Sequence, residues 1–143
     1  MKKNAYNIAV IPGDGIGKEV IPEAVKVLES VARKFDLSFN FDEKDWSCER
    51  FQKTGMMMPK DGLGSIRHHD SILLGAVGFP GVPDHISLWG LLIPIRRDFQ
   101  QYVALRPVRL FEGMPCPLIG REPGDIDFFI VRENNEGEYS EIG

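Results

Sequence analysis

The stretch that decides the fold is Tyr6-Asn7-Ile8-Ala9-Val10-Ile11-Pro12-Gly13-Asp14-Gly15-Ile16-Gly17, near the start of the chain. Its first six residues form an apolar run that stops at Pro-Gly, which is typical of a buried parallel strand. From Gly17 to about Lys34, apolar residues recur at the spacing of one helix face. A strand, a glycine turn and a helix in this order predict the beginning of an α/β layer.

The rest of the chain continues this alternation. Further strands are predicted over residues 37–41, 71–77, 103–110 and 126–131. A helix is predicted over residues 87–100, with Ser87 as its N-cap and with Pro94 near its first turns or at a break. Strands that alternate with helices predict an α/β domain with a largely parallel sheet, and after about Phe99 the pattern shifts toward strand and loop.

Composition argues against several functional classes. A net charge of −4 gives no support for nucleic-acid binding, and no apolar run is long enough to cross a bilayer. Met1-Lys2-Lys3 leads into a strand and not into the apolar core of a signal peptide. Cys48 and Cys116 are too few for a disulfide framework or a zinc site, so we expect free thiols in a cytoplasmic protein.

Two glycine-bearing segments follow predicted strands. Gly13-Asp14-Gly15-Ile16-Gly17 could place a pyrophosphate on the helix N-terminus, or it could simply be a tight turn that needs glycine conformations. Its G-x-G-x-G spacing departs from the G-x-G-x-x-G dinucleotide fingerprint. Gly75-Ala76-Val77-Gly78 ends a strand, where ligands of open α/β sheets tend to bind, although a buried strand that ends in a turn is the alternative.

Three arginines, Arg96, Arg106 and Arg132, are the strongest functional signal. A guanidinium is always charged and matches a carboxylate with two parallel donors, so several together predict a pocket for a small di- or tricarboxylic acid. Tyr139, in the same segment as Arg132, could supply or take a proton. The alternatives are solvated surface positions for Arg96 and Arg106, and an ion pair with Glu133 or Asp127 for Arg132.

Three motifs in order carry a resemblance to a known family: Ile11 to Val20, Leu105-Arg106-Pro107-Val108, and Arg132-Glu133-Asn134 through Tyr139. The chain resembles the β-decarboxylating hydroxyacid dehydrogenases, which include isocitrate, 3-isopropylmalate and tartrate/D-malate dehydrogenases. The resemblance implies an α/β, isopropylmalate dehydrogenase-like fold, which is not a Rossmann fold and is incomplete here. Residues 1–98 would be the N-terminal part of the first domain, and residues 99–143 the truncated start of the second, substrate and dimerisation domain.

The resemblance also implies the site. Arg96, Arg106 and Arg132 would hold the carboxylates of a small dicarboxylic acid, and Tyr139 would lie beside the carbon that loses carbon dioxide. The cofactor NAD would contact Ile16 and the segment Gly75, Ala76 and Val77. The metal ligands, the catalytic lysine and most of the NAD site would lie beyond Gly143, so we expect a homodimeric enzyme of which residues 1–143 alone are inactive.

The implied reaction is the oxidative decarboxylation of a 2-hydroxy acid. Mg²⁺ or Mn²⁺ would chelate the hydroxyl and its adjacent carboxylate. A base would remove the hydroxyl proton while hydride left C2 for the nicotinamide, and the resulting β-keto acid would lose carbon dioxide through a metal-stabilised enolate. The arginines would orient the substrate and stabilise charge throughout.

The segment Leu88-Trp89-Gly90 bears on which substrate is used. It looks most like the tartrate/D-malate branch, because the glutamate of isopropylmalate enzymes and the Ser-x-Asn of isocitrate enzymes are absent. Trp89 would narrow the pocket so that an unsubstituted acid fits, although a tryptophan packed in a helix core is the alternative. An isopropylmalate or isocitrate enzyme, and a non-catalytic anion- or nucleotide-binding module, remain the competing functions.

Overall fold

The computed structural model describes residues 4–137 and Ser140. The chain divides into two compact units, Met1–Asp98 and Phe99–Gly143. Among the described residues, no helix combines the length and apolar character that a bilayer span requires.

The first unit is built on a parallel sheet of three strands, β1 (Ala5–Gly13), β2 (Ser38–Glu43) and β3 (Ser71–Ala76), in the order β2-β1-β3. The central strand β1 is the most buried, with Ala9, Val10 and Ile11 at most 2% exposed. The predicted strands and their parallel arrangement are confirmed. Because adjacent parallel strands end at the same edge of a sheet, the segments after β1 and β3 meet.

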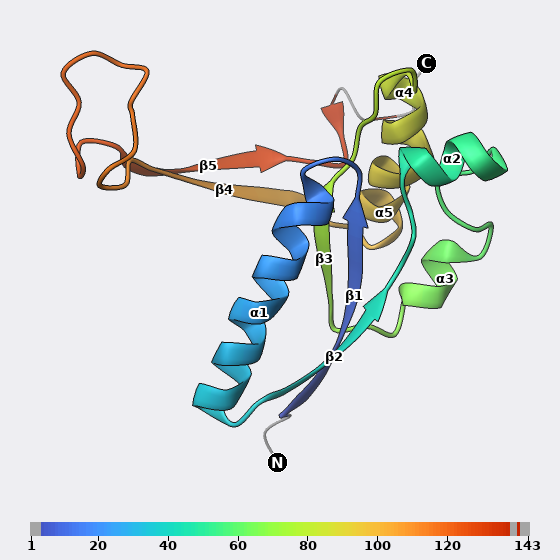
Figure 1. The fold of residues 1–143 in the computed structure, drawn as a ribbon. Coiled ribbons are helices and arrows are strands. Elements are labelled where there is room, and N and C mark those ends of the chain that lie inside the picture. Colours follow the sequence, from blue (N-terminus) through green and yellow to red (C-terminus); the bar gives the residue numbers. More distant parts are fainter. Residues whose placement is uncertain (1–3, 138–139, 141–143) are drawn as a thin grey trace. The chain divides into compact units, whose positions relative to one another are not determined.

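Helices cover both faces of this sheet (Figure 1). The predicted helix α1 (Gly17–Phe35) joins β1 to β2 and packs Ile21 against Ile8 and Val10. The connection from β2 to β3 holds two short helices, α2 (Cys48–Thr54) and α3 (Gly62–Ile66), which the sequence pattern did not predict. Right-handed crossovers in opposite directions along the sheet place α1 on one face and α2 with α3 on the other.

The helical segment after β3 differs from the prediction. It consists of α4 (Asp84–Ser87), the π-helix η1 (Leu88–Leu92) and α5 (Ile93–Asp98). Ser87 is not its N-cap, because the Ser87 hydroxyl donates to the Asp84 carbonyl oxygen over 3.0 Å inside the helix. Pro94 lies just after the π-turn. A proline lacks an N–H and crowds the preceding turn, so the wider turn of η1 accommodates it without ending the helix.

The second unit contains the two strands predicted after Phe99, β4 (Val103–Arg109) and β5 (Asp127–Glu133). They pair antiparallel, an orientation that the sequence pattern did not predict. The register runs from Val103 opposite Glu133 to Arg109 opposite Asp127. Large apolar side chains of both strands are exposed, among them Leu105 at 59% and Phe129 at 62%. Two strands alone are at best marginally stable in water, so this sheet needs further apolar surface to pack against.

Candidate functional site

The turn between β1 and α1 is pressed against the end of β3. The Asp14 N–H donates to the Ala76 carbonyl oxygen over 2.6 Å. A Cβ on Gly17 would lie 2.0 Å from the Pro12 carbonyl oxygen, and one on Gly75 would lie 2.3 Å from the same atom. No side chain fits at such distances, so these glycines are required for the close approach of two backbone segments.

This geometry decides between the two interpretations of the glycine loop. The N–H groups of Gly17, Lys18 and Glu19, the first three residues of α1, each donate to the carbonyl oxygen three residues earlier, over 2.9, 3.1 and 3.0 Å. A phosphate at a helix N-terminus needs such donors to be available. The structure therefore favours a tight strand-to-helix turn over a pyrophosphate-binding loop.

The Asp14 carboxylate is buried at the centre of this junction, with 2% of the residue exposed. It accepts hydrogen bonds from the backbone N–H of Cys48 at 2.9 Å, of Glu49 at 3.2 Å and of Gly78 at 3.2 Å. Three donors and the positive end of α2 compensate the buried charge. The sequence did not predict that Asp14 joins these segments, because its three partners are distant in the chain. The only local indication was an acidic residue between two glycines at the end of a predicted strand.

Cys48 lies beside this carboxylate and is fully buried. Burial, followed by a hydrogen bond to Asp14 and the negative charge of Asp14, raises the pKa of the Cys48 thiol to about 11. Cys48 and Cys116 are both free, as predicted. A thiol with so high a pKa carries almost no thiolate at neutral pH, which makes Cys48 a packed side chain and not a nucleophile.

The residues predicted to contact the cofactor come together in the first unit. Ile16 is 58% exposed at the tip of the turn after β1, while Gly75 and Ala76 end β3 and Val77 follows them. The bond from Asp14 to Ala76 joins these two segments at the carboxyl edge of the sheet. The structure thus provides a partly apolar wall there, and dinucleotide binding by this wall stays a prediction.

Trp89 is not packed in a helix core. It is 45% exposed on η1, and the Arg97 guanidinium lies 4.9 Å from the centroid of its ring. Together with Met56, Met57 and Met58 it lines a groove of about 570 Å³. Its role in substrate selection stays a prediction. Arg96, on α5 of the same unit, is half-buried.

Arg106 and Arg132, the other two arginines predicted to bind the substrate, lie on paired strands of the second unit. Ala104 pairs with Arg132, and Arg106 lies two residues beyond Ala104 on β4. Because side chains alternate along a strand, Arg106 and Arg132 are diagonal neighbours on one face of the second unit. Tyr139 lies outside the described residues.

Arg132 is held by polar neighbours at the end of β5. Its Nη2 donates to Asn134 Oδ1 over 3.2 Å, and Asn134 in turn donates from Nδ2 to the Gln101 carbonyl oxygen over 3.1 Å. Desolvation opposes ionisation of Glu133, but backbone N–H donors, foremost that of Asn135, and the charge of Arg132 lower the pKa of Glu133. Glu133, one of the two acidic partners expected for Arg132, therefore interacts with it electrostatically.

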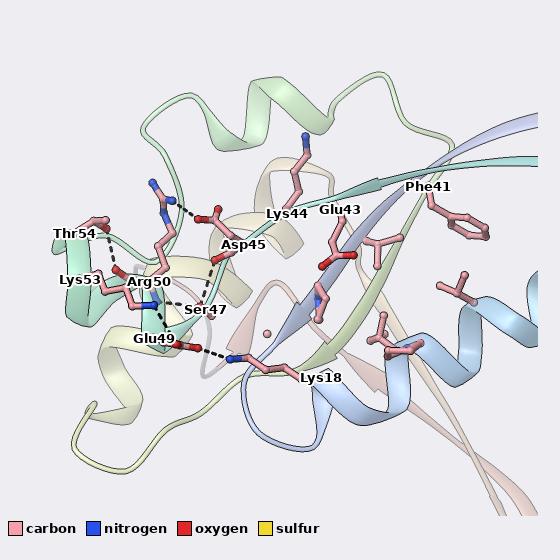
Figure 2. A pocket seen from close by; sticks show the side chains of 16 residues that line it. Lys18, Phe41, Glu43, Lys44, Asp45, Ser47, Glu49, Arg50, Lys53 and Thr54 are labelled. Carbon is pink, nitrogen blue, oxygen red and sulfur yellow. Dashed lines mark hydrogen bonds and ion pairs between the residues drawn. The ribbon is translucent and has the colours of Figure 1, made fainter.

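A pocket of about 730 Å³ that the sequence did not indicate lies between α1, α2 and the ends of β1 and β2 (Figure 2). Lys18 on α1 and Glu49 on α2 point toward one another across it and form an ion pair. Their hydrogen bond raises the pKa of Lys18 and lowers that of Glu49. Lys53 also pairs with Glu49 over 3.1 Å. The charges of this wall compensate one another, and no predicted site residue that the structure describes lines the pocket.

The described residues do not supply a metal site. Over residues 4–137 and Ser140, no group of three or more His, Cys, Asp or Glu side chains could hold an ion. The side chain of His69 is only 3% exposed, and its Nε2 lies 3.1 Å from Asp42 Oδ2. The described residues therefore do not provide the ligand set that the divalent metal implied by the resemblance would need, and none of them is given a role in holding it.

Known proteins match this chain over most of its length. The family model described as isocitrate/isopropylmalate dehydrogenase matches residues 7–143. The D-malate dehydrogenase [decarboxylating] of Escherichia coli K12 is 57% identical over 95% of the chain and 38% of its own length. The tartrate dehydrogenase/decarboxylase of Pseudomonas putida is 54% identical over 100% of the chain and 40% of its own length.

A solved structure confirms the predicted fold class. The apo β-decarboxylating dehydrogenase of Thermococcus kodakarensis superposes with a TM-score of 0.63 at 35% identity, over 92% of this chain and 35% of its own. The chain thus spans about two fifths of the length of the curated relatives it matches. The motifs, the fold and a match over residues 7–143 agree: the chain belongs to the isocitrate/isopropylmalate dehydrogenase family.

Proposed function

We propose that the chain is the N-terminal part of an NAD- and divalent-metal-dependent enzyme that oxidatively decarboxylates a 2-hydroxy dicarboxylic acid of the tartrate or D-malate type. One observation carries this proposal: identity is 57% and 54% to the D-malate and tartrate enzymes, but 35% to the Thermococcus β-decarboxylating dehydrogenase. The two relatives with more than half of their aligned residues identical are thus named for small, unbranched dicarboxylic acids.

The arginines support this substrate class. Arg106 and Arg132 are diagonal neighbours on one face of β4 and β5, a spacing that lets two guanidinium groups approach the carboxylates of one small acid. The partial burial of Arg132 strengthens its attraction for an anion. We assign Arg96 to the same substrate and Trp89 to the exclusion of branched acids.

The proposed chemistry needs an electron acceptor and a proton donor. A base would take the hydroxyl proton of the acid while NAD accepted the hydride from C2, beside the wall formed by Ile16, Gly75, Ala76 and Val77. The resulting β-keto acid loses its β-carboxyl group as carbon dioxide, and the electrons of the broken C–C bond pass into an enolate. Tyr139 would then protonate the former β-carbon, while Arg106 and Arg132 hold the remaining carboxylate.

The remaining parts of the enzyme would come from other residues. We place the ligands of Mg²⁺ or Mn²⁺, together with the catalytic lysine, in the part of the relatives' length that this chain does not span. We further infer a cytoplasmic homodimer, in which residues 1–98 begin the first domain and residues 99–143 begin the second.

A substrate panel tests the proposal. The product of the intact gene would be assayed for NADH formation with D-malate, L-tartrate, 3-isopropylmalate and isocitrate, with and without Mn²⁺. We expect metal-dependent turnover of D-malate or L-tartrate. Preference for isopropylmalate or isocitrate would contradict the substrate assignment, and no turnover of any of the four would contradict the reaction.

The chain offers a matched control for the arginines. Arg109 lies on β4 like Arg106, but it lies on the opposite face and pairs with Asp127 over 3.7 Å. Lysine keeps the charge but loses the two-donor fork, so Arg106→Lys and Arg132→Lys should each raise the KM for the acid about tenfold or more. Arg109→Lys should leave KM unchanged; equal effects of all three substitutions would show that the face of the sheet is irrelevant.

A further inference from the structure

We propose that Asp14 is a positioning residue that fixes the two loops of the dinucleotide wall to each other and to α2. The inference deepens the proposed function and rests on it for the identity of the ligand. Asp14 is 2% exposed and is not itself expected to touch a ligand. Its effect would act through the backbone segments that it holds.

Asp14 joins three segments that are far apart in the sequence. Its N–H donates to the Ala76 carbonyl oxygen over 2.6 Å, and its Oδ2 accepts from the Gly78 N–H over 3.2 Å. These two bonds hold the segment after β3 on both sides of Val77. The same carboxylate reaches the N–H groups of Cys48 and Glu49 at the start of α2.

A simple helix-capping role does not account for this arrangement. Ser47 already caps α2, because its Oγ accepts from the Arg50 N–H over 3.0 Å. The bond from Asp14 to Gly78 contributes nothing to α2, and it spans 64 residues of sequence. Gly15 lies in the turn between β1 and α1, and Gly78 and Gly81 lie in the segment after β3. Glycine leaves the backbone more conformational freedom than any other residue, so both loops gain from an added restraint. A buried acceptor shared by both loops supplies that restraint.

Two substitutions separate positioning from capping. Asp14→Asn loses the charge and keeps only one acceptor oxygen. In one orientation of the amide this oxygen accepts from Cys48 and Gly78 and the NH₂ group faces the Glu49 N–H; in the other orientation the oxygen accepts from Glu49 and the NH₂ group faces the N–H groups of Cys48 and Gly78. Ser47→Ala removes a cap of the same helix and touches neither loop. Both variants weaken α2, but only Asp14→Asn also weakens the hydrogen bond from Gly78, because a neutral amide oxygen is a weaker acceptor than a carboxylate.

Hydrogen exchange measures the positioning without reference to any ligand. In the product of the intact gene, Asp14→Asn should accelerate amide exchange in peptides that cover residues 12–20 and 74–82, as well as in α2. Ser47→Ala should accelerate exchange in α2 alone. Faster exchange confined to α2 in Asp14→Asn, or the same pattern in both variants, would overturn the positioning role.

Dinucleotide binding tests the functional half of the inference. Asp14→Asn should weaken NAD about tenfold or more, in both the Kd and the KM, while the KM for the acid changes much less, because displaced groups cost binding steeply. Ser47→Ala should leave both KM values unchanged. Loops that exchange faster while NAD binds as in the wild type would overturn the inference. If the wild-type protein turned over none of the acids, the proposed reaction would fail, whereas the exchange and NAD-binding data would still decide the role of Asp14.

Discussion

Replacing Gly17 by alanine separates helix propensity from packing. Gly17 is the first residue of α1, and alanine is favoured over glycine inside a helix by about 1 kcal/mol, so propensity alone predicts a more stable protein. The structure predicts the opposite. An added Cβ would lie 2.0 Å from the Pro12 carbonyl oxygen and 2.6 Å from the Ala76 nitrogen.

The size of the effect follows from which atoms are in the way. Both are backbone atoms of β1 and of its neighbour β3, so no side chain can rotate to make room. An ordinary contact needs more than an ångström of extra separation, which would pull the two strand ends apart. We expect the free energy of unfolding to fall by about 3 kcal/mol or more, the upper range for overpacking, and the propensity gain to offset little of it.

Urea unfolding measures this effect directly. Trp46 and Trp89 are the two tryptophans of the chain and both lie in the first unit, so tryptophan fluorescence follows the unit that contains Gly17. The control is Gly64→Ala in α3, where an added Cβ meets nothing within 4 Å. That substitution should be neutral or should stabilise by up to about 1 kcal/mol. A Gly17→Ala protein as stable as the control would refute the packing argument.

Two further predictions concern single side chains. The pKa of the Cys48 thiol is raised to about 11 in the folded protein, so the rate of its alkylation should rise with a midpoint near pH 11. The stability that the buried thiol contributes below pH 9 should be lost as the pH rises toward 11, because the unfolded chain then ionises first. An alkylation midpoint near pH 9 would contradict the buried placement. The Arg97 guanidinium lies over the Trp89 ring, so a double-mutant cycle of Arg97→Ala and Trp89→Leu on the free energy of unfolding should give a coupling of about 0.5–1 kcal/mol. Additive effects of the two substitutions would show that the contact contributes nothing.

Periodicity in the sequence predicted those parts of the fold whose signal is local. The apolar run of β1 and the helical spacing of α1 each identify one element without reference to any other, and both elements are present. The two arginines of the second unit share a face because Arg106 and Arg132 lie on strands whose alternation is regular. Such features follow from neighbours in sequence.

The features that were missed depend on contacts between distant residues. The helix α2 has only 7 residues, too few for a periodic pattern, and the N–H groups of its first two residues donate to Asp14, which is distant in the sequence. Ser87 was a plausible N-cap by residue type, but the helix begins at Asp84. The Ser87 hydroxyl donates to the Asp84 carbonyl oxygen within the helix. His69 lies in a polar stretch of the sequence, and its side chain is enclosed beside Asp42, which is 27 residues away in the chain. No local pattern carries this information.

The stoichiometry of carbon dioxide and NADH tests the central claim most directly. The product of the intact gene would be incubated with NAD, Mn²⁺ and D-malate labelled at C4, the carboxyl group β to the hydroxyl-bearing carbon. The account predicts one labelled carbon dioxide for each NADH formed, with pyruvate as the product. NADH without labelled carbon dioxide would show oxidation without decarboxylation, and it would contradict the claim that this chain begins a decarboxylating dehydrogenase.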